Sequence, residues 1–239
     1  MIEKINETNL ISNFYRDDIF YVRIMSLMKA YGFEYDFAVF YRQVLNNAVT
    51  AVISKLDGDF TVCANDDADF AEIEEFCKII GYNSLLCDDR LLSERHFTFG
   101  HIMQSVKKVE LHKNYTEIDK YPKLMELFNF LDYSSADFES WYVDVSHRIR
   151  HGCACAYSLN FDKQIVSSAM LSSIFNDRAI LSAVRTEDEY RGLGFGSTLV
   201  SEIICDFNGK VYLMRDEDKN EQFYKRLGFE NCGNWRMYK

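Results

Sequence analysis

The sequence predicts an α/β protein with mixed sheets, in which one chain forms two domains. Its 239 residues are enough for two domains of ordinary size, and short apolar runs alternate with segments of helical periodicity. A strand-strand-strand-helix-strand order occurs twice. Antiparallel strands followed by a strand-helix-strand unit form a mixed sheet. We expect a smaller N-terminal α/β domain over residues 1–105 and a second domain over 106–239.

The first half begins with a helical stretch that ends at the stop signal Tyr31-Gly32. Asp57-Gly58 joins two apolar runs and is a strong hairpin signal. A later segment places its apolar residues on one helical face and ends at Gly81. The expected strands are Phe37–Arg42, Asn47–Leu56, Asp59–Asn65 and Tyr82–Cys87, with a helix at Asp69–Gly81 and further strands within Phe97–Leu111.

The second half opens with two helices, one with Pro122 in its first turn and one with Ser134 or Ser135 as its cap. Three strands, a loop and a helix-strand-helix-strand series follow. The expected helices are Pro122–Phe130, Ser135–Arg150, Gly196–Phe207 and Asn220–Leu227; the expected strands are Cys153–Asn160, Ile165–Ile174, Arg178–Val184, Val211–Met214 and Asn234–Tyr238.

Composition excludes several classes of protein. The chain is 48% hydrophobic with a single proline, which argues against disorder, and its net charge of −10 argues against nucleic acid as a partner. No window approaches the ~20 apolar residues of a membrane span, and no basic, apolar leader begins the sequence. Seven scattered cysteines suit a reducing cytoplasm. The close pair Cys153 and Cys155 points to opposite faces of a strand, so we expect no metal.

The chemistry concentrates in the segment Arg191-Gly192-Leu193-Gly194-Phe195-Gly196-Ser197, which joins a strand to an amphipathic helix. Backbone N–H groups at a helix N-terminus lack partners within the helix, and the helix dipole adds positive charge there. Glycines let an anion approach the backbone closely, and Arg191 adds a permanent charge. A phosphate group is the natural ligand of such a segment.

Two other phosphate-binding motifs fit less well. A P-loop requires Gly-Lys-Ser/Thr, which is absent here. A dinucleotide fingerprint would place its third glycine at Ser197, and its strand would run directly into the first glycine instead of through an acidic loop. A glycine-rich turn without a ligand is the remaining alternative.

The segment resembles the cofactor-binding motif of the GNAT acetyltransferase superfamily, Arg/Gln-x-x-Gly-x-Gly/Ala after a strand that ends in valine. A second motif, Phe223-Tyr224-Lys225-Arg226-Leu227-Gly228-Phe229, follows at the expected distance. The resemblance covers about 130 residues of the C-terminal half. It implies the GNAT acyl-CoA N-acyltransferase fold, in which two strands of a mixed sheet splay apart to admit the cofactor. The implied cofactor is acetyl-CoA, the acetyl thioester of coenzyme A.

The resemblance also implies roles for particular residues. The loop amides would hold the pyrophosphate, and amides at the end of the preceding strand would pair with the pantetheine arm. Asn220 is a doubtful ligand because it could simply cap a helix, and the family's asparagine position holds Glu217 here. The implied cofactor-binding residues are Ala183, Val184, Thr186, Arg191, Gly192, Leu193, Gly194, Phe195, Gly196, Ser197, Asn220 and Phe223.

By resemblance, Tyr224 is the catalytic residue that protonates the sulfur of coenzyme A; alternatively it only packs on the sheet. An amine acceptor is protonated at neutral pH, so a general base would help. The strand before the glycine loop carries no carboxylate. The base therefore stays unassigned among Glu139, Asp144, His147 and the loop acids Glu187–Glu189.

The leading functional hypothesis is an acetyl-CoA-dependent N-acetyltransferase, a cytoplasmic enzyme that acts by direct attack of a small-molecule or peptide primary amine. The alternative is a non-catalytic module that binds coenzyme A for regulation. Transfer of a longer acyl chain is also open, and the sequence does not define the oligomeric state.

The N-terminal half repeats the same element order, and we hypothesise a degenerate GNAT-like domain there; an unrelated α/β domain is the alternative. Where the later copy has its glycine loop, this half has Asn65-Asp66-Asp67-Ala68-Asp69. These carboxylates would repel a pyrophosphate and suit a helix cap. We therefore expect no coenzyme A site in this half.

Overall fold

The computed structural model describes residues 1–111, 117–132 and 137–239. It contains two compact units. The first comprises Met1–Ile102, Met214–Glu217 and Cys232–Lys239; the second comprises Met103–Leu213 and Asp218–Asn231. The predicted domain boundary between residues 105 and 106 stays a prediction. Each compact unit is built from separate segments of the chain, so the units do not coincide with two continuous domains. Residues 232–239 lie in the first unit because Arg236–Tyr238 pair antiparallel with Cys87–Leu85.

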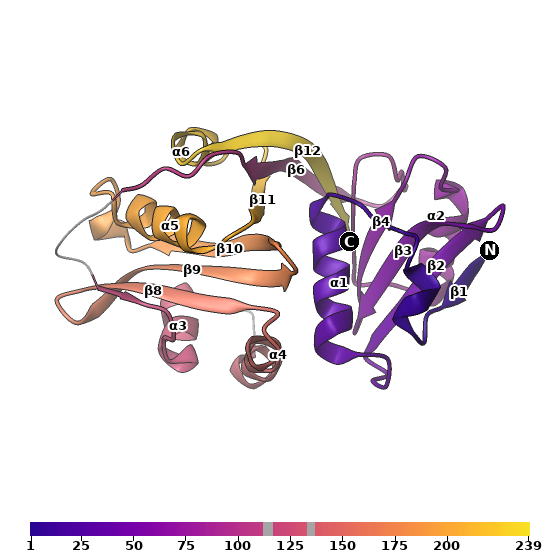
Figure 1. The fold of residues 1–239 in the computed structure, drawn as a ribbon, viewed down its shortest axis with the longest axis horizontal. Helices are drawn as coiled ribbons and strands as arrows, with labels where there is room; N and C mark the ends of the chain where they lie inside the picture. The colour runs from indigo at the N-terminus through magenta and orange to yellow at the C-terminus, as the bar shows by residue number, and fades with distance from the viewer. Residues whose placement is uncertain (112–116, 133–136) are drawn as a thin grey trace. The chain divides into compact units, whose positions relative to one another are not determined.

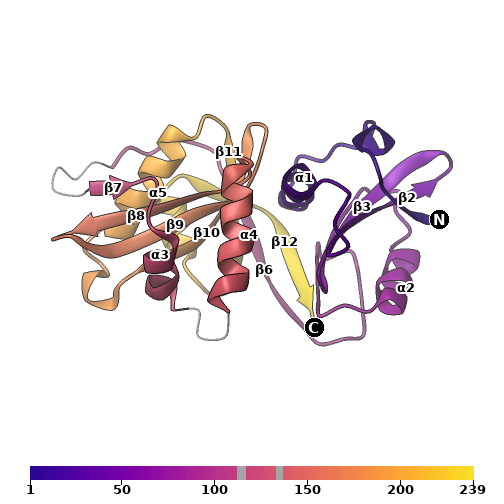
Figure 2. The ribbon, with the colours of Figure 1, turned by 90° about the horizontal axis from the view of Figure 1, so that it is seen from below.

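The first unit is a mixed sheet with a helix on each face (Figures 1 and 2). Its strands run in the order β1-β2-β3-β4-β5, antiparallel except for the parallel pair β4 and β5. The elements are β1 (Ile2–Lys4), η1 (Thr8–Ile11), α1 (Ile19–Tyr31), β2 (Ala38–Leu45), β3 (Ala48–Leu56), β4 (Asp59–Ala64), α2 (Phe70–Ile80) and β5 (Ser84–Cys87); β6 (Phe97–Ser105) follows.

Local signals in the first half are confirmed. Gly32 ends α1 and Gly81 ends α2, each with a positive φ and a backbone N–H that bonds back into the helix. Asp57, with φ 52°, forms the β3–β4 turn. The strand β1 was not predicted, because three residues are too few to show an alternating pattern.

The second unit repeats this arrangement. Strands β7 to β10 are antiparallel neighbours, and β10 pairs parallel with β11. The elements of this half of the chain are β7 (Glu117–Asp119), α3 (Leu124–Leu131), α4 (Phe138–Arg150), β8 (Cys155–Phe161), β9 (Gln164–Phe175), β10 (Arg178–Thr186), η2 (Asp188–Tyr190), α5 (Phe195–Asp206), β11 (Lys210–Asp216), α6 (Glu221–Arg226) and β12 (Phe229–Tyr238). The end of β11 from Met214 and most of β12, from Cys232, belong to the first unit.

Helices cover both faces of this second sheet. In Figure 1, α5 lies on one face and α3 and α4 lie on the other. The α5 face carries the larger apolar core, in which Leu199 and Ile203 of the helix pack against Leu181 and Val211 of the strands. The α3 and α4 face is built around Leu127, and this core fixes the two helices against β8 and β9.

Helix α4 begins later than expected. Its cap is Asp137, whose side chain accepts a hydrogen bond from Ser140 N, and the first helical residue is Phe138. The predicted cap residues Ser134 and Ser135 lie outside the described residues. Helix α3 is likewise shifted by two residues from Pro122 to Leu124. No helix in the described part of the chain is long and apolar enough to cross a membrane.

Gly228, which follows α6, gives a test of the packing in the second unit. Its φ is +86°, and an added Cβ would lie 2.5 Å from the carbonyl oxygen of Lys107. We expect Gly228→Ala to lower the free energy of unfolding by about 2–4 kcal/mol, from backbone strain and overlap together. In the matched control Gly152→Ala, φ is +64° but nothing lies within 4 Å, so only about 1–2 kcal/mol should be lost. Urea midpoints at an unchanged m-value measure both. Equal losses would show that the contact with Lys107 carries no energetic weight.

Candidate active site

Strand β10 extends beyond its pairing with β11. The register between the two strands ends at Leu181 opposite Leu213, but β10 continues to Thr186. Two residues, Ala183 and Val184, form a bulge opposite one residue of β9, and Ala183 adopts φ 52°. Beyond Leu181, this edge of β10 therefore has backbone groups that β11 does not engage.

A glycine loop brings the chain from β10 to the N-terminus of α5. Gly192 and Gly194 both have positive φ, and Gly194 occupies the N-cap position, so no side chain caps this helix. Its first-turn amides lack intrahelical acceptors and point out of the helix end. Gly196 lies close to the strand, because an added Cβ would be 2.7 Å from Thr186 Oγ1. Only glycine allows α5 to approach β10 so closely.

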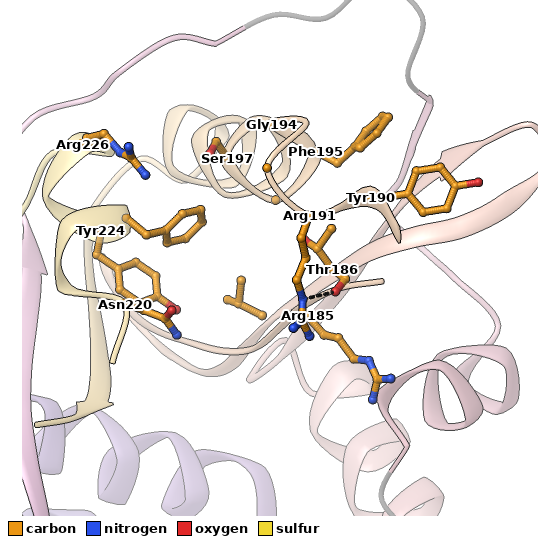
Figure 3. Close-up of a pocket in the computed structure, with 14 residues that line it drawn as sticks. Arg185, Thr186, Tyr190, Arg191, Gly194, Phe195, Ser197, Asn220, Tyr224 and Arg226 are labelled. Carbon is orange, nitrogen blue, oxygen red and sulfur yellow. Dashed lines mark hydrogen bonds between the residues drawn. The ribbon is translucent and has the colours of Figure 1, made fainter. Parts of the chain in front are cut away.

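A cavity of about 500 Å³ lies at this helix end, between the last residues of β10 and helix α6 (Figure 3). In Figure 3, Tyr224, Asn220 and Arg226 lie on one side of the space, and Arg191 and Thr186 lie on the other. The residues that line it are Val184, Arg185, Thr186, Tyr190, Arg191, Gly192, Gly194, Phe195, Gly196, Ser197, Asn220, Phe223, Tyr224 and Arg226.

The charged groups of this lining are arginines. Arg191 Nε donates to the carbonyl oxygen of Thr186 at 3.1 Å, and its guanidinium pairs with Asp188 at 2.7 Å. These contacts hold the exposed Arg191 against the end of β10. Arg185 donates instead to the carbonyl oxygen of Leu131 at the end of α3, and its side chain extends away from the cavity. The cavity is thus suited to an anion that also contacts the helix N-terminus.

Tyr224 lies between the apolar core and the cavity. Its ring packs edge-on against Phe223 and Phe229, with ring centroids 5.0 and 5.8 Å apart. Burial raises the pKa of the Tyr224 hydroxyl to about 12, because the phenolate would lose its hydration. The hydroxyl is therefore protonated at neutral pH and can act as a proton donor.

Comparison with known proteins identifies this arrangement. Residues 151–231 match the family model of the acetyltransferase (GNAT) domain. The matched segment of the C-terminal half, residues 151–231, is a GNAT acetyltransferase domain. This family match supports an acyltransferase.

Solved structures extend the fold comparison to the whole chain. A GCN5-related N-acetyltransferase from Kribbella flavida aligns with a TM-score of 0.62 and 13% identity over 92% of this chain and 93% of its own. A tandem GNAT protein from the clavulanic acid biosynthesis pathway aligns with a TM-score of 0.62 and 11% identity over 100% and 98%. A Drosophila protein aligns with a TM-score of 0.68 and 10% identity over 100% of this chain and 98% of its own. No curated protein matches the sequence.

The N-terminal half thus also matches tandem GNAT structures, and its contacts show how it departs from the glycine-loop pattern. Asp69 caps α2 by accepting a hydrogen bond from Glu72 N at 3.0 Å. Gln43 Nε2 donates to Glu72 Oε2 at 2.7 Å and also bonds the backbone of Asp69. The predicted cap is confirmed. The expected lack of coenzyme A binding in this half stays a prediction.

Most residues predicted for cofactor binding come together around the cavity of the GNAT domain. Ala183 and Leu193 are not among its lining residues; Ala183 packs instead on the α3 and α4 side of the sheet. Asn220 stands at the N-cap of α6 but makes no side-chain cap bond, so the capping interpretation finds no support. The side chain of Phe195 packs on Phe161 and Tyr190, which leaves its backbone as the part available to a ligand.

Three lining residues were not predicted: Arg185, Tyr190 and Arg226. Each is within two positions of a predicted residue. Arg185 and Tyr190 flank the fixed positions of the glycine motif, and Arg226 lies within the second motif, but neither motif assigns these three residues to the cofactor.

The candidate bases are dispersed. Asp144 pairs with Arg148 one turn along α4, and His147 stacks on His151 with ring centroids 4.1 Å apart. Asp188 pairs with Arg191. None of the candidates is among the described residues that line the cavity. The general base therefore stays unassigned. All seven cysteines are free, and the described residues contain no cluster of three or more His, Cys, Asp or Glu suited to a metal.

Proposed function

We propose that the GNAT domain binds acetyl-CoA in this cavity and transfers the acetyl group to a primary amine of a small-molecule or peptide acceptor. One observation carries the proposal: an uncapped, glycine-flanked helix N-terminus opens on a cavity lined by Arg191 and Arg226. A side chain at Gly196 would fill the closest approach between helix and strand. These features fit a pyrophosphate at the helix end.

The unpaired edge of β10 supports the position of the rest of the cofactor. Beyond Leu181 the backbone N–H and C=O groups on this edge of β10 are not paired with β11. The amide groups of a pantetheine arm could therefore pair with this edge as an added strand. When bound, acetyl-CoA supplies a thioester with an electrophilic acyl carbon. The acceptor nitrogen would add to that carbon, and the carbon–sulfur bond would then break to release the thiolate of coenzyme A.

Tyr224 supplies the proton for the departing sulfur in this proposal. A thiolate leaves more readily when a nearby acid protonates it, and the raised pKa keeps the Tyr224 hydroxyl protonated until it is needed. The surplus proton of the acceptor nitrogen passes to water or a base, and the tyrosinate regains a proton before the next turnover.

Two measurements on the full chain test the proposal. Calorimetry with acetyl-CoA should give one site per chain, and a panel of amines should show acceptor-dependent release of free thiol. Binding without thiol release from any amine would favour the regulatory module over the enzyme. Two sites per chain would contradict the assignment of the N-terminal half as degenerate, and no binding would refute the proposed function.

A further inference from the structure

The hydroxyl of Ser167 on β9 joins two groups of β10 beside the cavity. Ser167 is fully buried, and its Oγ lies 2.9 Å from the carbonyl oxygen of Arg185 and 3.0 Å from Thr186 Oγ1. A carbonyl oxygen can only accept, so the single hydroxyl hydrogen of Ser167 is needed for Arg185. The bond between the two hydroxyls then requires the hydrogen of Thr186.

The opposite assignment is disfavoured on electrostatic grounds. If Ser167 donated to Thr186 instead, its oxygen lone pairs would face the Arg185 carbonyl at 2.9 Å without a hydrogen between them. Such a contact between two oxygens at hydrogen-bond distance is repulsive, whereas a hydrogen on Ser167 Oγ directed at the carbonyl makes it attractive. The two hydroxyl hydrogens satisfy both contacts only when Thr186 donates to Ser167 and Ser167 donates to the carbonyl oxygen of Arg185.

Thr186 lines the cavity at the point where β10 meets the first turn of α5, close to Gly196. Because its hydrogen is committed to Ser167, its oxygen can offer only lone pairs to a ligand. We infer that Thr186 Oγ1 is a fixed hydrogen-bond acceptor for an amide N–H of the pantetheine arm, with Ser167 as the positioning residue that sets this polarity. The inference rests on the proposed function, since it assumes that the arm passes this point.

Because Thr186 Oγ1 can only accept, the site favours a hydrogen-bond donor of the ligand over a hydrogen-bond acceptor. An amide N–H facing Thr186 gains a hydrogen bond, whereas an ester oxygen at the same place meets lone pairs. The test compares coenzyme A with two analogues, each with one amide N–H of the pantetheine arm replaced by an ester oxygen. Calorimetric dissociation constants are measured for the wild type and three variants of the full chain.

The wild type should bind one of the two analogues about tenfold more weakly than coenzyme A, as expected for one lost hydrogen bond. In Thr186→Val, which keeps the shape but removes the oxygen, that preference should fall to about twofold or less. Ser167→Ala releases the hydrogen of Thr186, so the hydroxyl can donate to the ester and the preference should fall or reverse. The control Ser168→Ala removes a neighbouring serine that bonds the carbonyl of Ala183, and it should keep the wild-type preference.

The outcomes separate the two hypotheses. If Thr186→Val kept the full wild-type preference for coenzyme A over each of the two analogues, the inference would be overturned. The proposed function would remain intact. Failure of the wild type to bind coenzyme A would refute the proposed function itself. If Ser167→Ala does not fold, Thr186→Val still decides the question, because its side chain is close to isosteric and stands at the cavity wall.

Discussion

Ser197→Asp is expected to weaken coenzyme A binding at least about 100-fold without unfolding the protein. Ser197 is the third residue of α5 and lines the cavity. A carboxylate in a first helical turn favours the helix, because it faces the positive end of the dipole. The same carboxylate would stand where we place the pyrophosphate. Two negative charges about 4 Å apart repel by about 4 kcal/mol at an effective dielectric constant of 20.

The first unit contains a natural counterpart of this substitution. Glu72 is the third residue of α2, as Ser197 is of α5, and it lies at a helix end capped by Asp69. The comparison indicates that a carboxylate at this place is compatible with the fold.

Calorimetry and thermal melting measure the effect of Ser197→Asp. Acetyl-CoA should raise the melting temperature of the wild type by mass action but leave that of the variant unchanged. The control Ser197→Asn introduces a side chain of the same size as aspartate but without its charge, so it should retain most of the wild-type affinity for acetyl-CoA. Gly196→Asp should also abolish binding, but its Cβ would collide with Thr186, so loss of structure could contribute. Wild-type affinity in Ser197→Asp would exclude the α5 N-terminus as the phosphate site.

Tyr224→Phe is expected to lower kcat by about 100-fold or more, with the affinity for acetyl-CoA unchanged, once an acceptor has been found. Phenylalanine preserves the packing against Phe223 and Phe229 and removes only the hydroxyl. Binding and turnover should therefore separate. The control Tyr157→Phe removes the hydroxyl of a half-buried tyrosine on β8, whose pKa is also raised by burial, and should leave kcat unchanged.

The pH profile gives a second measure of the role of Tyr224. Its folded-state pKa is raised from the ordinary value of 10 to about 12, so the protonated donor persists as pH rises through 10. Tyr224 itself should cause no decline in kcat below about pH 11, since that decline follows the raised pKa. If Tyr224→Phe turned over at the wild-type rate, water or another group would have to protonate the sulfur.

Local signals explain why much of the fold and site could be predicted. The Asp57-Gly58 turn, the glycines that end α1 and α2, and the glycine loop before α5 depend on residues close together in the chain. Turn chemistry and helical periodicity act over such distances, so they are visible in sequence. The same holds for the carboxylate cap of α2, where Asp69 contacts its own helix.

By itself, then, the sequence determined the α/β class and the repeated element order. The phosphate site at Arg191–Ser197 and the acid role of Tyr224 stay predictions. Tertiary structure alone decided the place of residues 232–239, of which Arg236–Tyr238 pair with β5, about 150 positions earlier in the chain. It also decided the left-handed conformation of Ala183, which no glycine signals, and the hydroxyl pair of Ser167 and Thr186. These features depend on the register between paired strands, whether neighbouring as in β9 and β10 or distant as in β5 and β12, and register depends on the packing of the whole sheet.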